Sequence, residues 1–133
     1  MARTLPTATR DGILDYIDSL IGTTGKIQFQ QSDDQPVATC DLSNPAFDDA
    51  GSTGGNSDGV MTLEGTPSDT SAAGGTMSKF LFFDASGSPW VEIFQGTVGT
   101  SGEDINFAGG LTVGAGDTVT VTSFTLTCPA TPA

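Results

Sequence analysis

Hydrophobic positions change their spacing once along the chain, near residue 25. Before that point, apolar residues recur with the period of an α-helix and would lie on one face of it: Ile13, Leu14, Ile17, Leu20 and Ile21. Thr9 is placed to cap the start of this helix, and Gly22 to end it. The helix covers few turns, so its stability has to come from packing of the apolar face.

From residue 25 onward, apolar and polar residues alternate, as they do in half-buried β-strands. The clearest case runs from Lys26 to Gln30, where Ile27 and Phe29 share one face. Similar short runs follow, separated by turns rich in Gly, Asp and Ser. We expect strands at residues 26–30, 37–42, 60–63, 77–83, 89–94, 105–107, 111–113 and 118–127.

The strongest signal for two paired strands is a hairpin, formed by residues 77–83 and 89–94 around a short polar turn. Its first strand contains Phe80-Leu81-Phe82-Phe83, which is apolar on both faces, so we expect the helix or another subunit to cover the outer face. In the final strand the apolar residues change parity at Thr122–Ser123. This change predicts a bulge, or a strand that passes from one sheet to another.

These patterns predict a mainly β fold: an antiparallel β-sandwich, jelly-roll-like, with one short N-terminal helix. An immunoglobulin-like sandwich would show the same strand spacing and stays open. We expect a single globular domain, in which residues 1–24 form an N-terminal arm and a short amphipathic helix and residues 25–133 form the β-sandwich. Residues 1–8 are expected to be extended, and residues 48–59 and 66–75 to be polar loops.

Composition narrows the possible functions. Four Lys and Arg stand against sixteen Asp and Glu, a net charge of −12 that repels nucleic acids and anionic lipids, so we expect neither as a partner. The chain has no His, and it lacks the motifs of serine hydrolases and phosphate-binding loops. We therefore expect no enzyme activity, no metal and no cofactor. Acid pairs such as Asp33–Asp34 fit solvated loops better than a Ca²⁺ site, because EF-hand spacing is absent.

Two further features leave alternatives open. Cys40 and Cys128 fall in separate expected strands, where a disulfide would join an early strand to the last one. Two reduced thiols, as in a cytosolic protein, are the other possibility. Trp90 follows Pro89 in the hairpin, and an aromatic anchor between sheets or at a subunit contact is favoured over a platform for stacking carbohydrate.

Three segments carry a resemblance to a known family. They are LSNPAF at 42–47, VGTSGEDINF at 98–107 and TVTSFTLT at 120–127. With most of the remaining chain, they resemble a family of small tailed-bacteriophage proteins encoded among virion structural genes. The resemblance implies a structural role in the virion, and it carries over no catalytic residue because none of the shared segments is a catalytic motif.

Among virion locations, the acidity favours the outside of the particle, because packaged DNA would repel this chain. We expect a capsid decoration (cement) protein, made in the host cytoplasm, that binds the major capsid protein on the outer capsid surface. Many weak contacts on a lattice would then stabilise the shell, and self-association as a homotrimer suits its threefold positions. The expected contact residues are Arg3, Leu5, Arg10 and Trp90. Alternatives are a neck, tail or fibre-attached component and a carbohydrate-binding module.

Overall fold

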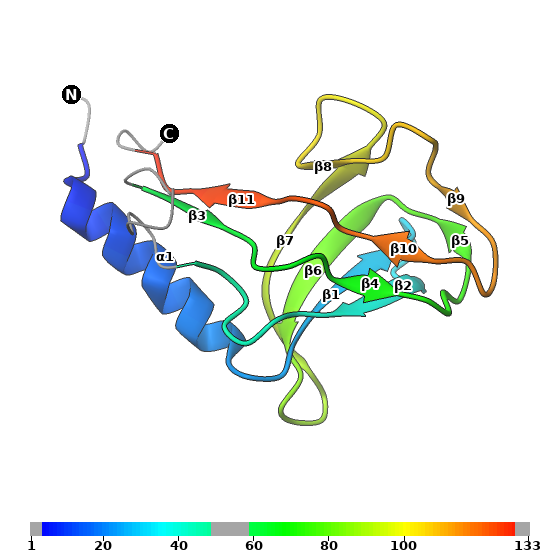
Figure 1. Ribbon diagram of the computed structural model, residues 1–133, viewed down its shortest axis with the longest axis horizontal. Coiled ribbons are helices and arrows are strands. Elements are labelled where there is room, and N and C mark those ends of the chain that lie inside the picture. The colour runs from blue at the N-terminus through cyan, green and yellow to red at the C-terminus, as the bar shows by residue number, and fades with distance from the viewer. Residues whose placement is uncertain (1–3, 49–58, 130–133) are drawn as a thin grey trace.

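The computed structural model describes residues 4–48 and 59–129, and within them it shows a mainly β protein with one helix (Figure 1). Arg3 and most of the loop expected at 48–59 lie outside the described residues. The helix is α1, Thr7–Ile21. The strands are β1 Gly25–Gln30, β2 Pro36–Asp41, β3 Val60–Thr62, β4 Ser68–Asp69, β5 Gly75–Thr76, β6 Lys79–Asp84, β7 Val91–Gly99, β8 Ile105–Asn106, β9 Thr112–Val113, β10 Val119–Thr120 and β11 Thr125–Thr127.

A curled sheet forms one layer, and among the described strands its order is β2-β1-β6-β7-β8. Neighbouring strands run antiparallel except β7 and β8, which are parallel, with Val98 opposite Ile105. The sheet is therefore mixed, and the expectation of a wholly antiparallel arrangement is wrong at this pair. The cause lies in residues 100–104, which fold back beside β7, where the Asp104 carboxylate accepts a hydrogen bond from the Thr97 N–H (2.9 Å).

The expected hairpin is present as β6 and β7, with a bulge after Phe82. Phe80 and Phe82 belong to the buried core, whereas Leu81 points to the other face, between Gln28 of β1 and Gln95 of β7. The helix was one expected cover for that outer face, and it does not cover it. Its buried residues belong to the same core cluster as Phe82, on the other face of the sheet. Leu81 is nevertheless only 6% exposed within the single chain.

A two-stranded antiparallel ribbon forms the second layer. β3 pairs with β11 and β4 with β10. Between these short strands the pairing continues, since the Leu63 N–H donates to the Phe124 carbonyl and the Val121 N–H to the Pro67 carbonyl, both at 2.9 Å. The register shifts by one residue between those two bonds. The change of parity predicted at Thr122–Ser123 is thus confirmed as a break in the strand, and it lets both Val121 and Phe124 be buried.

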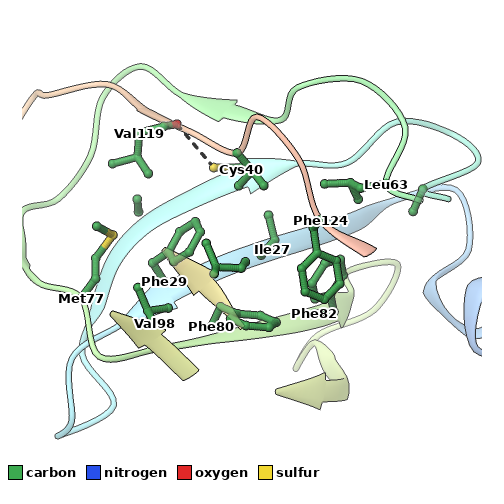
Figure 2. Packing of buried hydrophobic residues seen from close by; sticks show 14 of the residues in the cluster. Ile27, Phe29, Cys40, Leu63, Met77, Phe80, Phe82, Val98, Val119 and Phe124 are labelled. Carbon is green, nitrogen blue, oxygen red and sulfur yellow. Dashed lines mark hydrogen bonds between the residues drawn. The ribbon is translucent and has the colours of Figure 1, made fainter. Parts of the chain in front are cut away.

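The core lies between the sheet and the ribbon, and Figure 2 shows it from close by. Phe82 is its centre: its ring stacks on that of Phe94 (4.4 Å between centroids, 16° between planes) and contacts those of Phe47 and Phe124. Fully burying one such side chain contributes roughly 1.5–3 kcal/mol. This aromatic cluster ties both layers together, because Phe82 and Phe94 come from the sheet and Phe124 from the ribbon.

Helix α1 contributes Leu14 and Ile21 to the core. Two carboxylates fix its position: Asp11 accepts a hydrogen bond from the Gly59 N–H (2.6 Å) and Asp18 from the Phe47 N–H (3.2 Å). The helix ends as predicted at Gly22, which has φ 72°. Its start was predicted wrongly. The N-cap is Pro6, without a side-chain cap, because the helix extends one turn further toward the N-terminus than Thr9 suggests.

Two outer strand edges are covered by the chain itself. Along β2, the Val37 carbonyl accepts hydrogen bonds from the Ala73 and Gly74 N–H groups (2.9 and 3.2 Å). Along β3, the Asp48 N–H donates to Thr62, and the neighbouring Glu64 N–H donates to Ala46. Covered edges offer no backbone template to another molecule.

Candidate functional site: an apolar helix face and an edge groove

The basic residues expected to contact a partner have different surroundings. Arg3 lies outside the described residues. Arg10 is half-buried, and its guanidinium donates to the Leu5 carbonyl (3.2 Å) and to the Thr7 hydroxyl (3.0 Å). Arg10 therefore fastens the start of the chain to the first turn of the helix. Leu5 is half-buried as well.

Trp90 is 39% exposed, and its ring meets that of Phe83 edge-on at 5.6 Å. It does not lie between the two layers, so the anchor between sheets is wrong and a surface contact remains. Trp90 follows the β6–β7 turn, which reaches the end of α1, where the Ala85 N–H donates to the Thr24 carbonyl (3.1 Å). Leu5 and Arg10 lie at the opposite, N-terminal end of α1, so the structure does not bring them together with Trp90. Figure 1 shows the β6–β7 turn beside the C-terminal end of the helix.

The helix itself carries an exposed apolar surface, which includes Ile13 and Leu20 that the sequence pattern assigned to its packed face. Ile13, Tyr16 and Leu20, here called the helix patch, are 40%, 65% and 41% exposed. Their spacing of three and four residues places them on one side of α1. The width of the apolar stripe could have revealed this exposed surface. With Tyr16 included, the stripe is wider than the side of the helix on which Leu14 and Ile21 are buried.

Acidic groups lie on the other side of the helix and next to its C-terminal end. Asp11, Asp15 and Asp18 belong to the same helix. In the β6–β7 turn, hydrogen bonds from Ser86 lower the pKa of Asp84, which keeps that carboxylate charged. The cations of the described residues are engaged elsewhere, since Lys26 pairs with Asp41, Lys79 pairs with Asp34, and Arg10 holds the arm. The helix patch is therefore an apolar surface on a strongly acidic chain, and the described residues offer no unengaged cation beside it.

Both cysteines are free thiols, and the disulfide considered for Cys40 and Cys128 is not formed. The Cys40 Sγ lies in the core and donates to the Val119 carbonyl at 3.7 Å (Figure 2). Burial raises the pKa of the Cys40 thiol to about 12, and the carboxylates of Asp69 and Asp41 add to this effect. Cys128 is half-buried at the far end of the ribbon.

A groove runs between β7–β8 and the free side of β10–β11, and we call it the edge groove. It consists of two hollows, of about 290 Å³ and about 530 Å³, which share Asp104. Phe94 and Phe124 line the smaller hollow, and the hydroxyls of Thr120, Thr122 and Ser123 line the larger one. The groove can therefore form hydrogen bonds with an occupant through its hydroxyl groups and contact it through its aromatic rings. No local motif in the sequence indicated it, because it arises from two segments brought together by the topology.

Within residues 4–48 and 59–129, no three His, Cys, Asp or Glu side chains cluster closely enough to hold a metal ion. In the same part of the chain, the helix is too short and too polar to cross a membrane. No protein-family model matches the chain, and neither a curated protein nor a solved structure matches it significantly. None of the three comparisons therefore identifies a family for this chain.

Proposed function

We propose that the protein is a structural component of a tailed-phage virion, a decoration protein that binds the major capsid protein on the outside of the head and stabilises the shell. The observation that carries this proposal is the helix patch. Three large apolar side chains, Ile13, Tyr16 and Leu20, are exposed to solvent, although the chain buries several phenylalanines in its core. Exposed apolar side chains grouped on one face favour a contact surface.

Electrostatics supports an external position. The chain carries a net charge of −12, and each described cation already has a partner within the protein. Such a molecule is repelled by packaged DNA and attracted to basic rims on a protein shell. Tyr16 suits the centre of such a contact, because tyrosine buries a large area with few rotatable bonds.

The proposal extends to the fold and to self-association. We propose that the sheet and the ribbon are the two faces of a jelly-roll-like sandwich, in which Phe82 and Phe124 meet across the core. A homotrimer at threefold lattice positions would present three helix patches at once. Modest contacts multiplied over a lattice give tight retention.

The experiment compares phage particles with and without this protein. Particles that lack it should release DNA at a lower temperature and on milder osmotic shock. Quantitative mass spectrometry should find hundreds of copies in each complete particle. Unchanged heat resistance would contradict the decoration role, and about a dozen copies would move the protein to the neck, tail or fibres.

A second experiment examines the helix patch itself. Changing Ile13, Tyr16 and Leu20 to glutamine keeps helix propensity and should alter the unfolding free energy by only about 0.5 kcal/mol per site. Retention on purified protein-free particles should nevertheless fall about ten-fold or more. Val91→Gln, at an exposed apolar residue of β7, is the matched control. Equal loss with the control would remove the helix patch from the contact.

A further inference from the structure

The side of β7 that faces away from β6 is paired with β8 only at Val98 and Gly99, and before these residues it has no strand partner among the described residues. The Val98 N–H donates to the Ser78 carbonyl of the neighbouring segment (3.2 Å). Because hydrogen-bonding direction alternates along an antiparallel strand, Gly96 also faces β6, while Gln95 and Thr97 face outward. The Thr97 N–H donates to Asp104, as this alternation requires. Among the described residues, the N–H and carbonyl of Gln95 have no partner, and Gln95 lines the groove.

The ribbon has a corresponding open side. The Phe124 carbonyl accepts from Leu63 and the Cys128 N–H donates to Gly59, so the even-numbered residues of this stretch face β3. Thr125 and Thr127 then direct their backbone groups away from β3. The same hollow of about 290 Å³ is lined by Gln95, Thr125 and Thr127. Two open strand edges therefore border one groove.

This open border contrasts with the rest of the described structure. The edge of β2 is covered by Ala73 and Gly74, and the edge of β3 by Ala46 and Asp48. Natural sheets usually protect an open edge with proline, lysine or a covering loop. In β7, the stretch from Ile93 to Val98 contains neither proline nor lysine. The part of β7 before Thr97 is therefore an open edge next to a groove, which is the arrangement that accepts an added strand.

Charge indicates what kind of strand fits. Asp104 is the one charged residue among the described residues that line the two hollows, and it belongs to both. Bonds from the Thr97 N–H (2.9 Å) and hydroxyl (3.1 Å) to a single oxygen hold its carboxylate in place. A fixed carboxylate at the middle of a groove favours a lysine or arginine on the occupant. The described part of a second copy offers no unengaged cation, since Arg10, Lys26 and Lys79 are paired.

We propose that the edge groove binds an extended segment of a partner protein, which adds a strand at Gln95 and places a basic side chain on Asp104. Alternate side chains of that segment lie toward Phe94 and Phe124, so they are apolar. The larger hollow, about 530 Å³, lies within the range of roughly 300–1,000 Å³ that is typical of binding sites. The inference does not depend on the virion assignment, because it rests on strand edges and charge alone.

The test uses NMR titration of the full-length protein with a short synthetic peptide, in which threonine and valine alternate around one central lysine. Amide signals of Gln95, Thr97, Thr125 and Thr127 should shift, and added salt should weaken binding. The same peptide with glutamate in place of lysine, or with N-methylated backbone positions, should bind at least about ten-fold more weakly. No binding at millimolar peptide, or equal binding of the N-methylated peptide, would overturn the proposal.

Protein variants make the test specific to the groove. Asp104→Asn keeps an acceptor for Thr97 but loses the charge, and it should weaken binding about three-fold, as expected for one exposed ion pair. Glu92→Gln removes one negative charge from β7 outside the groove and should leave binding unchanged. Gln95→Pro removes an outward N–H without breaking a β6 bond and should weaken binding about ten-fold.

Three results would contradict this assignment. Equal weakening by Glu92→Gln and Asp104→Asn would mean that net charge alone attracts the peptide. Shifts confined to Ile13, Tyr16 and Leu20 would place the peptide on the helix patch instead. Shifts of the groove amides that depend on protein concentration without peptide would make a second copy of this chain the occupant. If Gln95→Pro fails to fold, the N-methylated peptide tests the same bond on the unaltered protein.

Discussion

The carboxylate of Asp69 in β4 accepts a hydrogen bond from the backbone N–H of Thr39 in β2 (2.8 Å), joining the ribbon to the edge of the sheet. Its other oxygen accepts from the Ser71 N–H (2.8 Å). One carboxylate thereby provides a hydrogen-bond acceptor for a backbone N–H of the edge strand β2 and also holds the loop that covers this strand. The contact links two segments that lie 30 residues apart in the sequence.

Asp69→Ala should reduce the unfolding free energy by about 1–3 kcal/mol, because the Thr39 N–H loses its partner in a half-buried position. Urea denaturation followed by fluorescence measures this change. Asp33→Ala is the matched control, since the Asp33 carboxylate accepts only a local bond from the Gln35 N–H (3.2 Å). If Asp33→Ala lowers the unfolding free energy as much as Asp69→Ala does, the hydrogen bond to β2 does not contribute more than a local turn bond.

The two cysteines should differ sharply in reactivity. In the folded protein a thiol reagent should label Cys128 and leave Cys40, which becomes reactive only on unfolding, because burial holds its pKa at about 12. Mass spectrometry after timed labelling counts the modified sites. Rapid labelling of both thiols under native conditions would contradict the buried position of Cys40.

The same thiol makes stability depend on alkaline pH. The pKa of Cys40 is raised on folding from 9.0 to about 12, so its contribution is complete below pH 9 and is lost as the pH rises toward 12. Unfolding free energies measured between pH 8 and pH 11 should therefore fall. The decline should be shallower for Cys40→Ala, and an identical decline would exclude the thiol as its cause.

Gly12 inside α1 and Gly22 at its C-terminal end should respond oppositely to alanine. A Cβ at Gly12 meets nothing within 4 Å in the helix, so Gly12→Ala should stabilise the protein by about 1 kcal/mol through helix propensity. Gly22 has φ 72°, so Gly22→Ala should destabilise it by about 1–2 kcal/mol. Thermal unfolding of both variants checks the pair. Shifts of the same sign would contradict either the helix bounds or its C-terminal conformation.

Adjacent phenylalanines of β6 should also differ. Phe82 is fully buried and stacked on Phe94, so Phe82→Ala should cost about 3–5 kcal/mol. Phe83 lies on the outer face against Trp90, and Phe83→Ala should cost roughly 1–2 kcal/mol. Denaturant titration of both variants gives their unfolding free energies and so compares the same substitution on the inner and outer faces of β6. Equal costs would mean that the outer face is covered as completely as the core.

Local patterns of the sequence were sufficient for the longer elements. Alternation from Lys26 to Gln30 predicted β1 and placed Ile27 and Phe29 in the core, where both are fully buried. The β6–β7 hairpin and the break at Thr122–Ser123 were also confirmed. Each of these signals is carried by neighbouring residues, so it can be seen without knowledge of the fold.

Features that depend on distant partners could not be predicted in this way. The parallel pairing of β8 depends on Asp104 binding back to Thr97, and the two-residue strands β4 and β10 exist only because each has the other. The helix residues Ile13 and Leu20 look as apolar as Leu14 and Ile21. Which of them is buried is decided by the position of α1, which Asp11 and Asp18 fix through bonds to distant backbone groups.

The segments that cover β2 and β3 also govern how copies of this protein behave when crowded. With those borders already occupied by its own backbone, a molecule cannot recruit identical neighbours there into a growing polymer. The acidic surface further opposes indiscriminate clustering. Self-association of the chain therefore has to use a surface other than these two borders, which limits it to closed assemblies of defined size.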